Sequence, residues 1–311
     1  MSHRDVASMA AARDPSPTAP PTHRRDGFHL IDDTAIVYDT PRDSQFSDIT
    51  YAVSTADRVA RIAFNRPEVL HSFRPTTIRE IQMALLDATE DPAIAVIVLT
   101  SNLDSQHYTP AFCAGGDQTV RDLTGYQDGS ERAPKLRVLD LHHSMRNCPK
   151  PILATVQGYA VGGGHILHMV SDLTIAADNA VFGQTGPRMG SFDAGFGCVR
   201  AAQLMGQKRA RELWFLCRFY SAQRAYEMGL VNEVCDPAVL ENVTAQWVRR
   251  IVMNSPTAIA ACKASLNVAE GGAELCQVGG VLTGLFYQSE ESREGRAAFL
   301  EKRAPNFRSK L

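Results

Sequence analysis

The chain has 311 residues, of which 44% are hydrophobic and 21% charged, and its formal net charge is -2 at pH 7. This composition is typical of a globular protein of one large or two small domains, and it offers no strongly basic face for nucleic acid. The longest apolar stretches, such as residues 93–99, are too short to span a bilayer, so no membrane protein is expected.

Residues 1–45 differ from the rest of the chain. The run 11–22 contains four prolines among Ala, Ser and Thr and has no helical or alternating apolar period. It also lacks the apolar core of a secretory signal. We therefore predict a disordered or loosely attached N-terminal arm, with ordered structure beginning near Phe46.

Regular elements follow in chain order. Residues 49–54 and 58–64 are predicted as a strand hairpin, and Pro75 opens a helix with an apolar face. Further strands are predicted at 95–100, 152–156 and 173–177, and helices at 136–146, from the glycines 162–164, and through most of the chain after Gly197. Strands that alternate with helices and give way to a helical tail indicate one continuous α/β domain, with a core over 46–254 and a helical segment over 255–311.

The seven cysteines are scattered and never form a Cys-x-x-Cys pair. This pattern favours reduced thiols over a disulfide framework or a zinc site, and no metal is predicted. Cys113 lies beside a glycine-rich segment and could be a nucleophile, but a small buried side chain is the favoured interpretation. His165 and His168 are likewise interpreted as core histidines, because no further ligands complete a metal set nearby.

Two glycine-rich segments, residues 111–118 and 158–165, each follow a predicted strand. Glycines at such junctions let backbone N–H groups approach a ligand, and one N–H from each segment could form an oxyanion hole for a thioester carbonyl. The alternative is two tight turns that need positive φ. A dinucleotide fingerprint is excluded because Leu167 occupies its third glycine position, and no Gly-Lys-Ser/Thr completes a P-loop.

Four segments, residues 64–67, 111–118, 158–165 and 182–184, resemble the motifs of the crotonase superfamily in order and spacing. The resemblance covers about residues 46–308. It implies an α/β spiral of ββα units whose C-terminal helical part assembles a homotrimer or homohexamer. By position, the N–H groups of Gly116 and Gly163 would hold the enolate of a coenzyme A thioester, with coenzyme A present only as part of the substrate.

The resemblance also implies a set of contacts with the acyl-CoA substrate. These would come from Ala114, Gly115, Asp117, Gln118, Tyr126, Tyr159, Val161, Gly162, Thr185 and Lys302.

Ile166 and Gly186 stand where hydratases of the superfamily have two glutamates. Addition of water needs one carboxylate to activate the water and another to deliver a proton. Neither Ile166 nor Gly186 can transfer a proton, so hydration of an enoyl-CoA is not expected.

The remaining motifs resemble the naphthoate synthase branch, 1,4-dihydroxy-2-naphthoyl-CoA synthase. They are residues 164–169, 184–187, 190–193, 211–215, 285–287, 294–296 and 302–303. That branch closes a ring of o-succinylbenzoyl-CoA by intramolecular Claisen condensation in menaquinone or phylloquinone biosynthesis. A carbanion α to the thioester attacks a protonated carboxyl carbon.

Within this branch, one subgroup uses an aspartate as the base and another uses bound bicarbonate. Gly186 occupies the position of the aspartate, while Gln184, Thr185 and Trp214 match the bicarbonate subgroup. The resemblance therefore implies a catalytic bicarbonate bound by Gln184, Thr185, Gly186 and Trp214. Taken alone, Trp214 would be interpreted as a core residue.

Three further roles come from the resemblance. Asp193 would donate or relay a proton, Ser191 would position the substrate, and Tyr287 would bond the developing oxyanion. Without the motif, Asp193 would be interpreted as the cap of the helix near Gly197, and Tyr287 as a packed aromatic.

Leu70 replaces an arginine that contacts the phosphate or ribose end of coenzyme A in the branch, and His71 or Arg74 could compensate for it. Residues 156–158, 187–190 and 291–295 also resemble 2-ketocyclohexanecarboxyl-CoA hydrolase, which opens a ring through the same enolate. That hydrolase is the alternative function, and a non-catalytic scaffold of the same fold is a third. The terminal residues 309–311, Ser-Lys-Leu, would direct a eukaryotic protein to peroxisomes, and a cytoplasmic location is otherwise expected.

Overall fold

The computed structural model describes part of the N-terminal arm and most of the chain after it. The described residues are 32, 34–103, 107–122, 125–126, 136–189, 195–268, 289–301, 303 and 305–307. The predicted arm up to residue 31 and the Ser-Lys-Leu terminus lie outside them.

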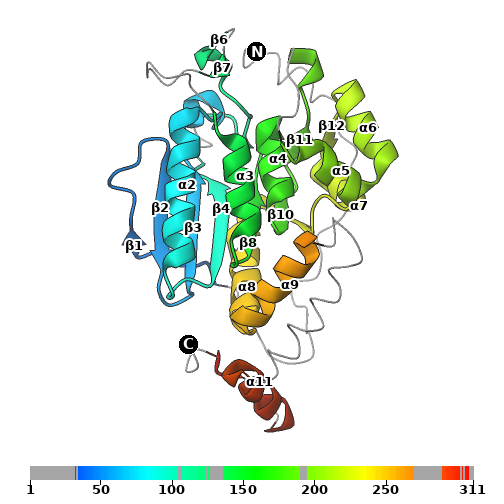
Figure 1. The fold of residues 1–311 in the computed structure, drawn as a ribbon. Coiled ribbons are helices and arrows are strands. Elements are labelled where there is room, and N and C mark those ends of the chain that lie inside the picture. The colour runs from blue at the N-terminus through cyan, green and yellow to red at the C-terminus, as the bar shows by residue number, and fades with distance from the viewer. Residues whose placement is uncertain are drawn as a thin grey trace.

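A seven-stranded sheet forms the centre of the molecule (Figure 1). Its strands in spatial order are β1 (Thr40–Pro41), β2 (Ile49–Ser54), β3 (Val59–Phe64), β4 (Val96–Ser101), β8 (Ile152–Val156), β10 (Leu173–Ala177) and β13 (Glu233–Cys235). The first two pairings are antiparallel and the other four are parallel. The central strands β4 and β8 are buried along their whole length, as expected of parallel strands covered on both faces.

A second sheet of four short strands lies next to the candidate site. In spatial order it contains β12 (Phe219–Ser221), β11 (Val181–Gly183), β9 (Tyr159–Val161) and β5 (Ala111–Cys113). The pairings of β9 with β5 and β11 are parallel, so the carboxyl ends of these three strands meet at one edge. A separate pair joins β6 (Arg121–Asp122) and β7 (Gly125–Tyr126).

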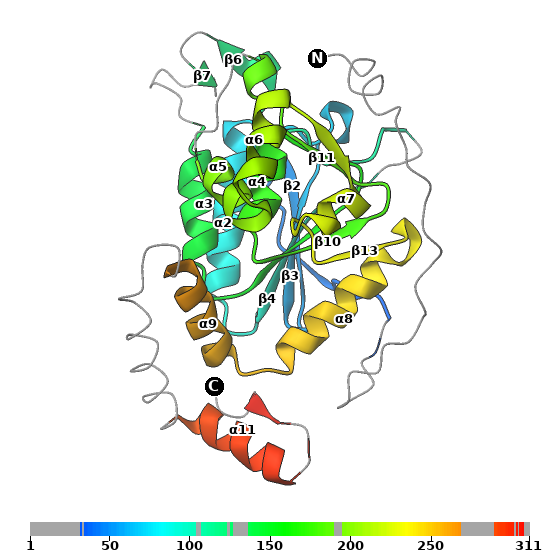
Figure 2. The same ribbon diagram turned by 90° about the vertical axis from the view of Figure 1, so that its right-hand side faces the viewer.

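Helices cover both faces of the large sheet (Figures 1 and 2). The α-helices in the described part of the chain are α2 (Pro75–Glu90), α3 (Val138–Asn147), α4 (Gly163–Val170), α5 (Gly197–Met205), α6 (Gln207–Leu216), α7 (Ala222–Glu227), α8 (Leu240–Val252), α9 (Pro256–Val268) and α11 (Glu290–Glu301). Of these, α11 lies apart from the sheet (Figure 1). Alternating residues of β4 belong to different cores, since Ile97 and Leu99 pack in the larger cluster with α2 to α7 while Val96 and Val98 pack in the cluster that includes α8. No helix among the described residues is long and apolar enough to cross a bilayer.

Most elements agree with the sequence-based expectations. The strands β2, β8 and β10 have the predicted bounds, and α2 begins at Pro75. The short strands β5, β9, β11, β12 and β13 were not predicted. Packed structure also starts before Phe46, because β1 pairs with β2 and Ile36 and Tyr38 pack against the α8 side.

Candidate active site

The turn that follows β3 supports the first glycine segment. Leu70 and His71 both have φ in the left-handed region, 53° and 54°, which bends the chain sharply. The turn then makes backbone hydrogen bonds to the loop after β5, in which the N–H of Ala114 donates to the oxygen of Leu70 at 3.0 Å. Phe73 forms an isolated parallel bridge to Gly116.

The two glycine segments lie against each other. A Cβ on Gly115, whose φ is +87°, would stand 3.0 Å from both the nitrogen of Gly163 and the oxygen of Val161. A Cβ on Gly164 would stand 2.0 Å from the oxygen of Cys113. Side chains at Gly115 and Gly164 would therefore push the segments apart, which is the physical reason for glycine at both positions.

Gly116 and Gly163 are the two predicted oxyanion donors, and each comes from one of these adjacent segments. No described residue accepts a hydrogen bond from the N–H of either. Gly163 is also the first residue of α4, so its N–H belongs to the positive end of the helix dipole. Two unpaired N–H groups on touching segments are the arrangement that binds the oxygen of a polarised carbonyl.

The third element at this edge is the chain after β11. Gly162 donates its N–H to the oxygen of Gly183 at 3.0 Å, and the side-chain Nε2 of Gln184 donates to the oxygen of Gly162 at 3.1 Å. The hydroxyl of Thr185 would lie 3.6 Å from a Cβ on Gly162. The structure thus brings Gln184 and Thr185 next to the second glycine segment, while Tyr159 and Val161 lie in β9 at its start.

Tyr126 lies over the first glycine segment. Its hydroxyl would be 2.1 Å from a Cβ on Gly116 and accepts a hydrogen bond from Nε2 of Gln118 at 2.9 Å. The same Nε2 donates to the oxygen of Gly116 at 2.9 Å. Burial is the main reason that the pKa of Tyr126 is raised, so its hydroxyl is a neutral donor at physiological pH.

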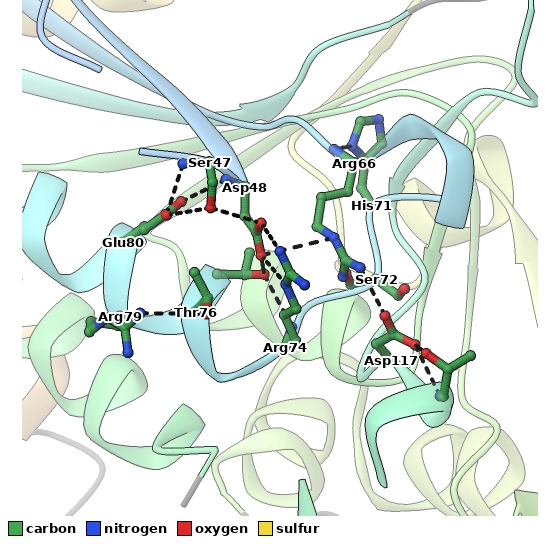
Figure 3. A network of polar contacts seen from close by, with 12 residues as sticks. Ser47, Asp48, Arg66, His71, Ser72, Arg74, Thr76, Arg79, Glu80 and Asp117 are labelled. Carbon is green, nitrogen blue, oxygen red and sulfur yellow. Dashed lines mark hydrogen bonds and ion pairs between the residues drawn. The ribbon is translucent and has the colours of Figure 1, made fainter. Parts of the chain in front are cut away.

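A network of hydrogen bonds and ion pairs connects the first glycine segment to the turn after β3 (Figure 3). Arg66 donates from Nη2 to the Oδ2 of Asp117 at 3.0 Å and from Nη1 to the oxygen of Ser72 at 2.5 Å. Asp117 also accepts hydrogen bonds from the N–H and hydroxyl of Thr119. Burial works against the charged carboxylate, but the bonds from Thr119 and Arg66 outweigh it and keep the pKa of Asp117 below its usual value. The Asp117 side chain is therefore ionised, and its carboxylate holds the loop in place through these hydrogen bonds.

The network continues through Asp48, which pairs with the guanidinium of Arg74 at 2.7 Å and accepts from Thr77 at 2.6 Å. His71 is 3% exposed, and its Nδ1 accepts the backbone N–H of Arg66 at 3.0 Å. Both residues that could have replaced the missing arginine at Leu70 are thus engaged within the protein. The Arg74 side chain is still 39% exposed, and the expectation that His71 or Arg74 contacts coenzyme A stays a prediction.

Trp214 is buried in α6, and its Nε1 has no hydrogen-bond partner among the described residues. A buried N–H without a partner is costly, so this atom is a candidate for binding a ligand. Cys113 is fully buried, and burial raises the pKa of its thiol to about 12, which excludes a role as nucleophile at neutral pH.

His165 and His168 lie in the core, as predicted, with Nδ1 of His165 2.8 Å from Nε2 of His168. The Nε2 of His165 has no partner among the described residues, so the pair is only partly satisfied. No cluster of potential metal ligands occurs in the part of the chain that the structure describes. Four predicted functional residues lie outside the described ranges, namely Ser191, Asp193, Tyr287 and Lys302.

Phe73, Ser72 and Arg66 support the site but were not predicted as functional residues. The available signal was the motif at residues 64–67, which begins 47 positions before the glycine segment 111–118, and the sequence does not show that the two meet.

Comparison with known proteins identifies the family. The family model for enoyl-CoA hydratase/isomerase matches residues 54–310. An enoyl-CoA hydratase from Bacillus anthracis is 28% identical, with a TM-score of 0.74, over 84% of this chain and 99% of that chain. An enoyl-CoA hydratase from Mycobacterium smegmatis is 26% identical, with a TM-score of 0.75, over 84% and 99%. An enoyl-CoA hydratase subunit I from Geobacillus kaustophilus is 29% identical, with a TM-score of 0.74, over 85% and 99%.

The family model covers the strands from β3 onward, both glycine segments and the C-terminal helices, and the matches together confirm the predicted crotonase-type α/β fold. The chain belongs to the enoyl-CoA hydratase/isomerase family, the crotonase superfamily of enzymes that act on acyl-CoA thioesters.

Proposed function

We propose that this protein catalyses the intramolecular Claisen condensation of o-succinylbenzoyl-CoA to 1,4-dihydroxy-2-naphthoyl-CoA. The main support is the pair of unpartnered N–H groups of Gly116 and Gly163 on adjacent segments. Such a pair serves any enolate of a CoA thioester. Ile166 and Gly186 occupy the positions of the two hydratase glutamates. Neither has a carboxylate, which favours a reaction other than hydration.

In this proposal the thioester oxygen accepts hydrogen bonds from Gly116 and Gly163, which acidifies the adjacent CH₂ group. Loss of one α-proton gives the enolate, whose negative charge stays on the thioester oxygen near the N-terminus of α4. The α-carbon then forms a bond with the carbon of the protonated ring carboxyl group. One molecule of water leaves, and tautomerisation gives the aromatic diol.

Gly186 cannot take the α-proton, so a base must come from elsewhere. Bicarbonate held by Gln184, Thr185, Gly186 and Trp214 would supply that base. Two donors support this part of the proposal, because Trp214 has a buried Nε1–H without a described partner and Thr185 offers a hydroxyl beside Gly162. Neutral donors of this kind bind a small oxyanion without introducing a competing charge.

Ser191, Asp193, Tyr287 and Lys302 keep the roles implied by the sequence resemblance as part of this proposal. Asp193 would donate or relay a proton, and Ser191 would position the substrate. Tyr287 would bond the oxyanion, and Lys302 would contact the CoA part. Assembly into a homotrimer or homohexamer through the helical segment 255–311 is proposed on the same basis.

The decisive experiment is turnover of o-succinylbenzoyl-CoA in carbon dioxide-free buffer, with and without added bicarbonate. Absorbance of the naphthoyl product that rises only with bicarbonate would support both the synthase and its anion site. Absence of product in both buffers would overturn the synthase proposal. Hydrolysis of 2-ketocyclohexanecarboxyl-CoA by the same preparation would then assign the ring-opening alternative.

A further inference from the structure

One buried residue, Phe73, contacts both glycine segments of the candidate oxyanion hole, the first through its backbone and the second through its ring. The N–H of Phe73 donates to the oxygen of Gly115, and the oxygen of Phe73 accepts from the N–H of Asp117, both at 2.8 Å. These two bonds bracket Gly116. On the other side, a Cβ on Gly163 would lie 2.4 Å from Cζ of the Phe73 ring.

The backbone contacts fix the direction of one candidate donor. Because both neighbours of Gly116 bond to Phe73, the N–H of Gly116 points away from the Phe73 strand, as the alternating groups of a parallel bridge require. The ring contact limits the position of the other donor. The Phe73 ring fills the space beside Gly163, so the first turn of α4 cannot move toward the turn at residues 70–73.

Phe73 is itself held firmly. Its exposed fraction is 2%, and it belongs to the larger hydrophobic core. The backbone oxygen of the preceding residue, Ser72, accepts a hydrogen bond from the guanidinium of Arg66. The side chain of the following residue, Arg74, forms an ion pair with Asp48 (Figure 3). A ring fixed in this way can act as a rigid spacer, since packed interiors resist compression.

We propose that Phe73 is a positioning residue that sets the separation of the Gly116 and Gly163 N–H groups, and so the strength of the oxyanion hole. The inference rests on the proposed use of these two groups. It extends that use by assigning the geometry of the hole to a side chain that never touches the substrate.

The test measures enolate stabilisation without turnover. Acetoacetyl-CoA, a β-keto thioester whose enolate absorbs in the ultraviolet, is bound to saturation, and its ionisation is titrated by absorbance on the intact protein. Wild-type protein is expected to favour the bound enolate relative to free ligand. The Phe73→Leu variant is expected to reduce the ionisation constant of the bound ligand by roughly tenfold to a hundredfold, because a shift of about 1 Å in a donor weakens such sites strongly.

Ile94→Val is the control for core packing. Ile94 belongs to the same core and is also 2% exposed, and it lies before the amino end of β4, outside both glycine segments and the turn that supports them. Both variants remove core packing and are expected to lose stability, whereas only Phe73→Leu is expected to change the ligand's ionisation. Equal ionisation constants in Phe73→Leu and Ile94→Val would overturn the inference.

Gly163→Ala tests the same contact without altering Phe73. Gly163 has no positive φ, and within 3.4 Å a Cβ there would meet only the Phe73 ring. Gly163→Ala is thus expected to weaken enolate binding through this contact, and the double variant with Phe73→Leu is expected to recover part of the loss. Strictly additive effects would contradict the spacer role. A wild-type protein that gives no shift at all would instead overturn the oxyanion hole, and with it both proposals.

Discussion

The Oδ2 of Asp117 lies 3.0 Å from Nη2 of Arg66, and both side chains are nearly buried, at 5% and 12% exposure. The pair joins the end of β3 to the loop that presents Gly116. Removal of one member leaves a buried charge without its partner, which typically lowers stability by about 3–5 kcal/mol.

We therefore expect Asp117→Asn to lower the free energy of unfolding by about 3 kcal/mol, measured by urea denaturation. Glu227→Gln is the control, since its ion pair with Arg224 is exposed on both sides and its loss is expected to change the stability little. Similar losses in the two variants would show that the Arg66–Asp117 pair is not a structural support.

Because the side chain of His71 is buried, we expect the stability of the protein to depend on pH. Burial is the main reason that the pKa of His71 is lowered from 6.5 to about 4. Between these two values the unfolded chain binds a proton that the folded chain does not, so stability falls as the pH decreases from 6.5 to 4. The contribution of one such residue is about 1.4 kcal/mol per pH unit.

His71→Asn is expected to remove that contribution from the slope of unfolding free energy against pH. Asparagine tolerates the left-handed φ and keeps an acceptor for the N–H of Arg66. An unchanged slope in His71→Asn would refute the prediction.

The two tryptophans allow a matched test of the proposed anion site. Trp214→Phe removes an Nε1–H that has no described partner, so stability is expected to change little. If this N–H binds bicarbonate, the concentration of bicarbonate for half-maximal activity is expected to rise about tenfold, the equivalent of about 1.4 kcal/mol for a charge-assisted bond.

Trp247→Phe should behave in the opposite way. Its Nε1 donates to Glu233 at 2.7 Å, so its replacement is expected to lower stability by about 1–3 kcal/mol with no effect on the bicarbonate requirement. A bicarbonate requirement that is the same in both variants would remove Trp214 from the site.

Alanine substitutions at Gly164 and Gly206 distinguish the cost of steric crowding from the cost of a left-handed backbone conformation. A Cβ on Gly164 would lie 2.0 Å from a backbone oxygen, and a Cβ on Gly206 would meet nothing within 4 Å although its φ is +80°. Gly164→Ala is expected to lower the free energy of unfolding by about 3 kcal/mol or more, and Gly206→Ala by about 1 kcal/mol. Urea denaturation of the two variants measures the difference, and a larger loss in Gly206→Ala would contradict the packing argument.

The elements whose signals are local could be predicted from the amino-acid sequence. Pro75 and the apolar face that follows define α2, and the β-branched runs of β8 and β10 define strands with the observed bounds. The two glycine segments and their place after strands were also evident, because glycine tracts are recognised from neighbouring residues alone.

Which of these segments meet in space depends on how the whole chain packs. The three-residue strands β5, β9 and β11 are too short to have a periodic signal and exist because they pair with each other. Arg66 and Asp117 are 51 positions apart, and nothing local to either predicts their ion pair. Phe73 likewise contacts Gly163 only because the fold closes the turn after β3 onto the N-terminus of α4. Contacts between distant segments depend on the packing of the whole chain, and local propensity contains no information about that packing.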